Sequence, residues 1–102
     1  MSTFVEFVSY NAPGVEEDRL MDLRRDAIMA VKEAHPALLD VPAIMRTGEE
    51  SYVDVWIYES QESADAANAG AAEIAPFMAF MGVLTDIEFQ VGTMADNAAS
   101  PL

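Results

Sequence analysis

Four segments of the chain are predicted to be β-strands, the first from its β-branched and aromatic residues and the last two from an alternation of two kinds of residue, which is typical of strands whose two faces meet different surroundings. These segments are Thr3–Tyr10, Ala43–Thr47, Ser51–Tyr58 and Asp86–Met94. The third is the most regular, because three aliphatic residues point one way while three aromatics and an acid point the other. We therefore predict four strands, of which the third has one plain apolar face and one face suited to line a pocket.

Helical periodicity fills the two long intervals between these strands. After the first strand, apolar residues recur every three or four positions until Pro36, which ends the predicted helix: Leu20, Leu23, Ala27, Val31 and Ala34. A second, alanine-rich helix is predicted from about Gln61 to Ala75, with Ser60 placed to cap its start. Pro76 interrupts it, and Phe77–Leu84 is predicted to add a further helical turn or two.

The element order is therefore β-α-β-β-α-β, which predicts an α+β, ferredoxin-like domain with a four-stranded antiparallel sheet and two helices on one face. The expected strand order across the sheet is 4-1-3-2. We place a single domain over residues 1–94 and a flexible tail over 95–102, because the tail is composed of small and polar residues.

Both faces of the predicted sheet are apolar, although two helices cover only one of them. We expect one face to be formed by Val5, Phe7, Val53, Val55, Ile57, Ile87, Phe89 and Val91. The other face is expected to carry Phe4, Val8, Tyr10, Trp56 and Tyr58. A monomer would expose one of these faces to water, so we predict a homodimer that packs sheet against sheet.

Composition narrows the classes of partner. The 102 residues contain 18 acidic and 5 basic side chains, a net charge of −13, which should repel nucleic acid and anionic membranes. No apolar run is long enough to span a bilayer. The absence of cysteine, together with an N-terminal segment that lacks a basic stretch and a cleavage site, leads us to expect a cytoplasmic protein.

The end of the third strand carries a motif that resembles a known family. Tyr58-Glu59-Ser60-Gln61-Glu62 is similar to the Trp-Glu-Ser-x-Glu segment of antibiotic biosynthesis monooxygenase-like domains, in the dimeric α/β-barrel superfamily. The resemblance extends from Thr3 to Met94 and implies a dimeric α/β barrel. It also implies cofactor-free oxidation of an aromatic, polyketide-like molecule by O₂, in a pocket between sheet and helices. At the family's tryptophan and asparagine positions, this chain instead has Tyr58 and Asp54.

Two acids are candidates for the chemistry of the site, Asp54 as the general base and Glu6 as a ligand-binding neighbour with which it could share a proton. Asp54 lies in the middle of a strand between aromatics, where burial would raise its pKa and suit it to general-base catalysis. Glu6 occupies a similar place on the neighbouring first strand and is expected to lie close to it. The alternative is that these acids face water or pair with Arg46 or another arginine.

The remaining candidates would bind a ligand. Trp56 and Tyr58 are suited to position a planar ring, and Tyr58 is also a catalytic candidate through the resemblance. Arg46 is a candidate for stabilising developing negative charge. The rim and lid candidates are Tyr10, Asn11, Phe80 and Met81. The alternatives are ordinary packing for the aromatics, Phe80 and Met81, and a turn role for Asn11.

No cofactor or metal is predicted. The only histidine, His35, ends the first helix, so the second helix has no axial ligand for haem, and no Gly-rich phosphate loop is present. Two functions remain open: a cofactor-independent, monooxygenase-like enzyme acting on a small aromatic ligand, and a non-catalytic dimer that binds a ligand or a protein.

Overall fold

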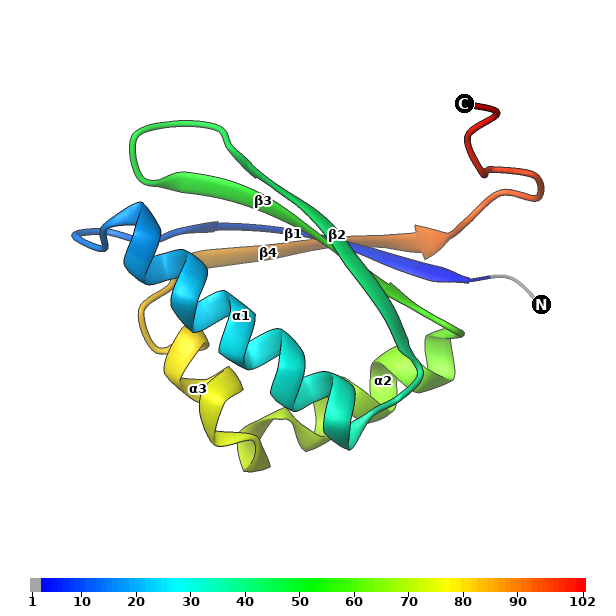
Figure 1. The fold of residues 1–102 in the computed structure, drawn as a ribbon, viewed down its shortest axis with the longest axis horizontal. Helices are drawn as coiled ribbons and strands as arrows, with labels where there is room; N and C mark the ends of the chain where they lie inside the picture. The colour runs from blue at the N-terminus through cyan, green and yellow to red at the C-terminus, as the bar shows by residue number, and fades with distance from the viewer. Residues whose placement is uncertain (1–2) are drawn as a thin grey trace.

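The fold is a four-stranded antiparallel sheet with its helices gathered on one face, as a computed structural model of residues 3–102 shows (Figure 1). Residues 1–2, the first two of the predicted domain, lie outside the described part. The elements follow the order β1 (Phe4–Asn11), α1 (Glu17–Ala34), β2 (Leu38–Arg46), β3 (Ser51–Tyr58), α2 (Gln61–Gly70), η1 (Ala71–Glu73), α3 (Ala75–Met81) and β4 (Thr85–Thr93). The predicted ferredoxin-like α+β class is confirmed.

The strand order across the sheet is β2-β3-β1-β4, which is the expected 4-1-3-2 order read from the other edge. Strands β1 and β3 are the central pair, in which Glu6 lies opposite Trp56 and Val8 lies opposite Asp54. Because residues opposite each other in an antiparallel pair share a face, Glu6, Val8, Asp54 and Trp56 all point toward the helices.

The second helical region differs from the prediction of one helix to Ala75. Helix α2 ends at Gly70, and its start is capped by Ser60, whose side chain accepts a hydrogen bond from the Ser63 backbone N–H. A 3₁₀ turn and then α3 follow, with Pro76 in the first turn of α3. Glycine weakens a helix and proline needs no N–H partner in a first turn, which explains the division of the region into separate segments.

Strand β2 is longer than the predicted Ala43–Thr47. It includes Pro42, which is tolerated because β2 is an edge strand and because its pairing with β3 is irregular between Asp40 and Ala43. An edge strand can lose an N–H donor without leaving a gap in the sheet.

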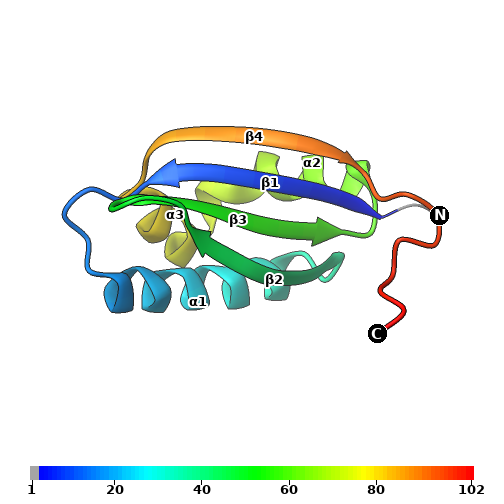
Figure 2. The same cartoon turned by 90° about the horizontal axis from the view of Figure 1, so that it is seen from above.

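The helix-facing side of β1 and β3 forms the core. Its buried members, all less than 10% exposed, are Phe4, Glu6, Val8, Tyr10, Tyr52, Asp54, Trp56 and Tyr58. The helices lie beneath the sheet in Figure 1, and in Figure 2, which is seen from above, no helix lies in front of the strands. The side of the sheet opposite the helices, which we call the bare face, has an apolar centre formed by Val5, Phe7, Val53, Val55 and Ile57.

The placement of Ile87, Phe89 and Val91 on the bare face is wrong. Across β1 and β4, Phe89 pairs with Val8 and Val91 pairs with Glu6, so both lie on the side of the helices. They are nevertheless 55% and 53% exposed, because the helices leave that side of β4 largely open. The sequence shows which residues of a strand share a face, but only the register with β1 shows which face it is.

Residues 95–102 form no helix or strand and are mostly exposed. Within the described residues, no helix combines the length and apolar character that a membrane crossing requires.

Candidate functional site

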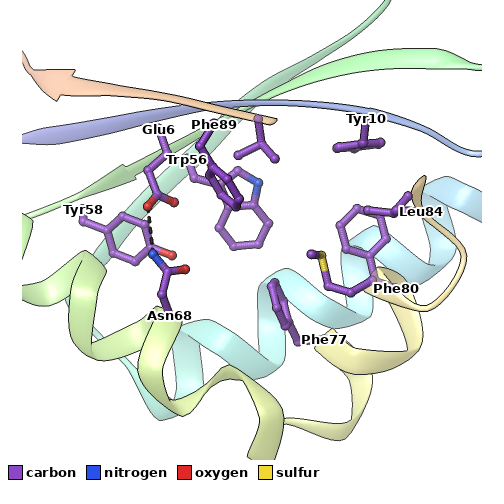
Figure 3. A pocket seen from close by; sticks show the side chains of 11 residues that line it. Glu6, Tyr10, Trp56, Tyr58, Asn68, Phe77, Phe80, Leu84 and Phe89 are labelled. Atoms are coloured by element: carbon purple, nitrogen blue, oxygen red, sulfur yellow. Dashed lines mark hydrogen bonds between the residues drawn. The ribbon is translucent and has the colours of Figure 1, made fainter. Parts of the chain in front are cut away.

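A pocket lies between the helix-facing side of the sheet and the helices α2 and α3 (Figure 3). Strands β1, β3 and β4 supply its upper wall and the helical segments supply its floor. Most lining residues are apolar or aromatic; the full set is Glu6, Val8, Tyr10, Trp56, Tyr58, Asn68, Phe77, Phe80, Met81, Leu84 and Phe89. Glu6, Tyr58 and Asn68 gather at one end, whereas Phe80 and Leu84 lie at the other.

Glu6 supplies the only charged side chain among these lining residues. It is 5% exposed, and its Oε2 accepts a hydrogen bond from Asn68 Nδ2 at 3.0 Å. Burial raises the pKa of the Glu6 carboxyl above its ordinary value, and the nearby charge of Asp65 adds to the rise, while the Asn68 hydrogen bond opposes it. A carboxyl with a raised pKa in an apolar pocket has the properties of a general base or acid.

Two aromatic residues of β3 complete the polar end and the middle of the pocket. The pKa of the Tyr58 hydroxyl is raised, mainly by burial and also by the charge of Glu6, so Tyr58 remains a hydrogen-bond donor. Trp56 contacts Phe77 of α3 edge-to-face, with ring centroids 6.2 Å apart and an interplanar angle of 88°. Trp56 therefore presents an aromatic surface inside the pocket whose position is fixed from below.

Asp54 is fully buried, and it does not line the pocket. Arg24 of α1 binds it with two hydrogen bonds, Nε to Oδ2 and Nη2 to Oδ1, both 2.9 Å long. The Tyr10 hydroxyl donates to Oδ2 at 2.9 Å and the Val55 N–H to Oδ1 at 3.1 Å. Four donors stabilise the carboxylate, so its geometry favours a structural link between α1 and the sheet over proton transfer. Of the alternatives for Asp54, pairing with an arginine is the one observed.

The other candidate residues divide between the pocket and the far end of the sheet. Tyr10, Phe80 and Met81 line the pocket, and Tyr10 packs edge-to-face on Phe80 with centroids 5.9 Å apart. Arg46 lies outside it, with its Nη1 3.8 Å from Glu17 Oε1 and its guanidinium 6.0 Å from the Tyr52 ring centroid.

Asn11 also lies outside the pocket. Its amide donates to Asp86 Oδ2 at 2.9 Å, and its carbonyl oxygen accepts from the Ser51 hydroxyl at 2.8 Å. This network joins β1 to the starts of β3 and β4. The arrangement fits a structural role at the ends of the strands, close to the turn role that we left open.

Sequence reasoning did not single out Asn68 or Arg24. The helical spacing nevertheless places both on a buried face, because Asn68 follows the buried Ala64 by four residues and Arg24 follows the buried Leu20 by four. A polar residue in register with a buried one on a helix is a candidate partner for a buried acid. The sequence does not say which acid, since Asn68 lies 62 residues from Glu6.

The pocket is narrow in this conformation. Its volume is 30 Å³, room for only a few water molecules at about 10–15 Å³ each. An aromatic ligand therefore requires some lining side chains to move. Three of them are suited to this, because Phe77 and Met81 are only partly buried and Phe89 is more than half exposed. Among residues 3–102, no cluster of three or more acidic or histidine side chains is placed to hold a metal ion.

Solved structures show the same fold. SnoaB, a cofactor-independent oxygenase from Streptomyces nogalater, superposes with a TM-score of 0.70 at 12% identity over 100% of both chains. A candidate antibiotic biosynthesis monooxygenase from Caulobacter crescentus gives 0.72 at 16% identity over 93% of this chain and 92% of its own. A NIPSNAP family protein of unknown function from Agrobacterium tumefaciens gives 0.66 at 17% identity, over 98% and 93%.

These similarities confirm, at the level of the fold, the resemblance to antibiotic biosynthesis monooxygenase-like proteins. At identities this low, a shared fold does not imply a shared reaction, and a protein of unknown function has the same fold. No protein-family model matches the chain, and no curated protein matches it by sequence.

Proposed function

We propose that this protein is a homodimeric, cofactor-independent oxygenase whose substrate is a planar aromatic molecule bound between the sheet and α2–α3. One observation carries the proposal: the buried Glu6 carboxyl, with a raised pKa, lies in a pocket walled by aromatic side chains. The fold shared with SnoaB, a cofactor-independent oxygenase, supports this choice of reaction.

In the proposed reaction, Glu6 removes a proton from a ring CH₂ of the substrate, and the resulting carbanion reacts with O₂. One oxygen atom becomes a new ring carbonyl, and the other leaves as water with the two hydrogens of the CH₂. Tyr58 donates a hydrogen bond to the substrate oxygen on which negative charge develops, and Trp56 packs against the ring. Glu6 thus takes the role of base that the sequence suggested for Asp54.

Replacing Glu6 with glutamine tests the base. Glutamine keeps the shape of the side chain and an oxygen that accepts from Asn68, but it takes up no proton. With anthrone as a neutral planar probe, we expect the wild type to accelerate oxygen uptake and the Glu6→Gln variant to lose about 10²–10⁴-fold of that rate. Glu33→Gln, at an exposed position of α1, makes the same change of charge and should keep the wild-type rate. Equal rates in Glu6→Gln and wild type would exclude Glu6 as the base.

The pH dependence of turnover provides a second, independent test. Because the base must be deprotonated, the rate should rise with pH through the raised pKa of Glu6. Asn68 lowers that pKa by donating to the carboxylate, so Asn68→Ala should move the rise to higher pH. Asp65 raises it through like charge, so Asp65→Asn should move the rise to lower pH. A rate profile measured in both variants checks the assignment, and shifts in one common direction would contradict it.

The dimer is part of the same proposal. The centre of the bare face is apolar, and Phe7 within it is 47% exposed. Exposed apolar patches of this kind on a small domain commonly mark an interface. A second copy packed on this face would enclose it between two sheets and leave the pocket, which lies on the other side of each sheet, open to ligand.

The alternative is a non-catalytic dimer that binds a small ligand or a protein. The small volume of the pocket favours it, since the lining side chains leave too little space for an aromatic ring. A protein that forms the dimer and binds planar aromatics, but consumes no oxygen with any of them, would support this alternative over the oxygenase.

A further inference from the structure

The pocket contains one negative charge and no positive one. Its eleven lining residues include no lysine, arginine or histidine, and Glu6 is the single charged group among them. Arg24, which lies deepest among the arginines, is already bound by Asp54 through both carboxylate oxygens. When Glu6 is ionised, a ligand with a carboxylate or phosphate would therefore meet a negative charge and no compensating cation.

Only one of the two oxygens of the Glu6 carboxylate accepts a hydrogen bond from the described residues. Asn68 donates to Oε2, and within residues 3–102 it is the only group that donates to this carboxylate. The second oxygen, Oε1, remains available to a ligand at the polar end of the pocket, where Glu6, Tyr58 and Asn68 lie together (Figure 3). A carboxylate oxygen only accepts hydrogen bonds, so it selects a ligand that donates one.

We infer that Glu6 determines ligand specificity: the pocket takes an uncharged, planar molecule that donates a hydroxyl or N–H to Glu6, and it rejects molecules that carry a carboxylate or phosphate. Asn68 acts as a positioning residue by holding one oxygen of Glu6, while Trp56 and Phe77 supply the flat apolar surface. This inference rests on the proposed function only in placing the ligand in this pocket, and it does not depend on oxygen chemistry.

Trp56 provides a direct reporter, because it is the only tryptophan of the chain and it lines the pocket. Its indole N–H gives a single, assignable NMR cross-peak that can be followed as a ligand is added. Three matched probes separate the effects of shape, hydrogen bonding and charge: 2-naphthol, 2-methoxynaphthalene and 2-naphthoate. All three share one ring system, whereas only the first is both neutral and a donor.

We expect 2-naphthol to bind about tenfold more tightly than 2-methoxynaphthalene, which lacks the donor. It should bind at least about a hundredfold more tightly than 2-naphthoate, which repels Glu6. In Glu6→Gln, the penalty on 2-naphthoate should fall by about tenfold or more, since the repulsion is gone. Glu33→Gln, at an exposed position of α1 and outside the pocket, should preserve the wild-type ratios.

Three outcomes would overturn the inference. The first is equal affinity of the wild type for 2-naphthol and 2-naphthoate, and the second is a penalty on 2-naphthoate that Glu6→Gln leaves unchanged. The third is a Trp56 cross-peak that none of the probes moves, which would remove the pocket as a ligand site. By contrast, the expected order of affinities without any oxygen uptake would contradict only the proposed reaction.

Discussion

Replacing Asp54 with asparagine is expected to destabilise the fold by about 3–5 kcal/mol, because the change leaves the Arg24 guanidinium buried without a counter-charge. Asp54 is fully buried and Arg24 is only 14% exposed, so water cannot substitute for the lost carboxylate. The substitution also weakens the acceptor that the Tyr10 hydroxyl uses. Urea denaturation followed by circular dichroism measures the loss.

Two further variants show whether the cost comes from a buried unpaired charge. Asp22→Asn removes an ion pair of the same residue types on the outside of α1, where both partners are about 60% exposed, and should change stability by less than about 1 kcal/mol. The triple variant Arg24→Met, Asp54→Leu and Tyr10→Phe removes the whole polar cluster and should recover much of the stability. A loss below about 1 kcal/mol in Asp54→Asn alone would contradict this account.

The two acids of the central strands therefore have separate tasks, although they look alike in sequence. Asp54 accepts hydrogen bonds from four donors and holds α1 against the sheet. Glu6 accepts one, has a raised pKa and lines the pocket. A loss of activity in Asp54→Asn would follow from unfolding as easily as from lost chemistry, which is why the base is tested at Glu6.

Much of the fold follows from local pattern alone. Strict alternation in β3 and the three-and-four spacing in α1 are consequences of backbone geometry, so they are readable without knowledge of neighbours. The order β-α-β-β-α-β then limits the topology, because short connections favour antiparallel neighbours. The break at Gly70 was less readable, since an alanine-rich segment continues on both sides of it.

The site was predictable only in part, because it depends on partners distant in sequence. Glu6, Trp56, Tyr58 and Phe80 follow from strand alternation and apolar composition, and all four line the pocket. The pairing of Asp54 with Arg24 spans 30 positions and decides whether the acid is free or bound. Alternation cannot reveal such a partner, since it specifies a face of a strand but not the side chain that arrives from the opposing helix.

Introducing lysine at Val55 is expected to separate the proposed dimer into monomers. Val55 lies at the middle of the bare face, between Phe7 on β1 and Ala43 on β2. A lysine buried there would have no partner, at a cost of about 2 kcal/mol or more per copy. A twofold dimer contains the change twice, so about 4 kcal/mol is lost and the dissociation constant rises about a thousandfold.

Light scattering coupled to size-exclusion chromatography measures the mass at micromolar concentration. Met29→Lys is the matched control, because Met29 is an exposed apolar residue on α1, 66% accessible and on the opposite side of the sheet from the bare face. It should leave the dimer intact, and circular dichroism should show that Val55→Lys monomers keep their fold, since their lysine then faces water. A wild-type protein of monomeric mass would contradict the dimer, as would a Val55→Lys variant that associates as strongly as the wild type.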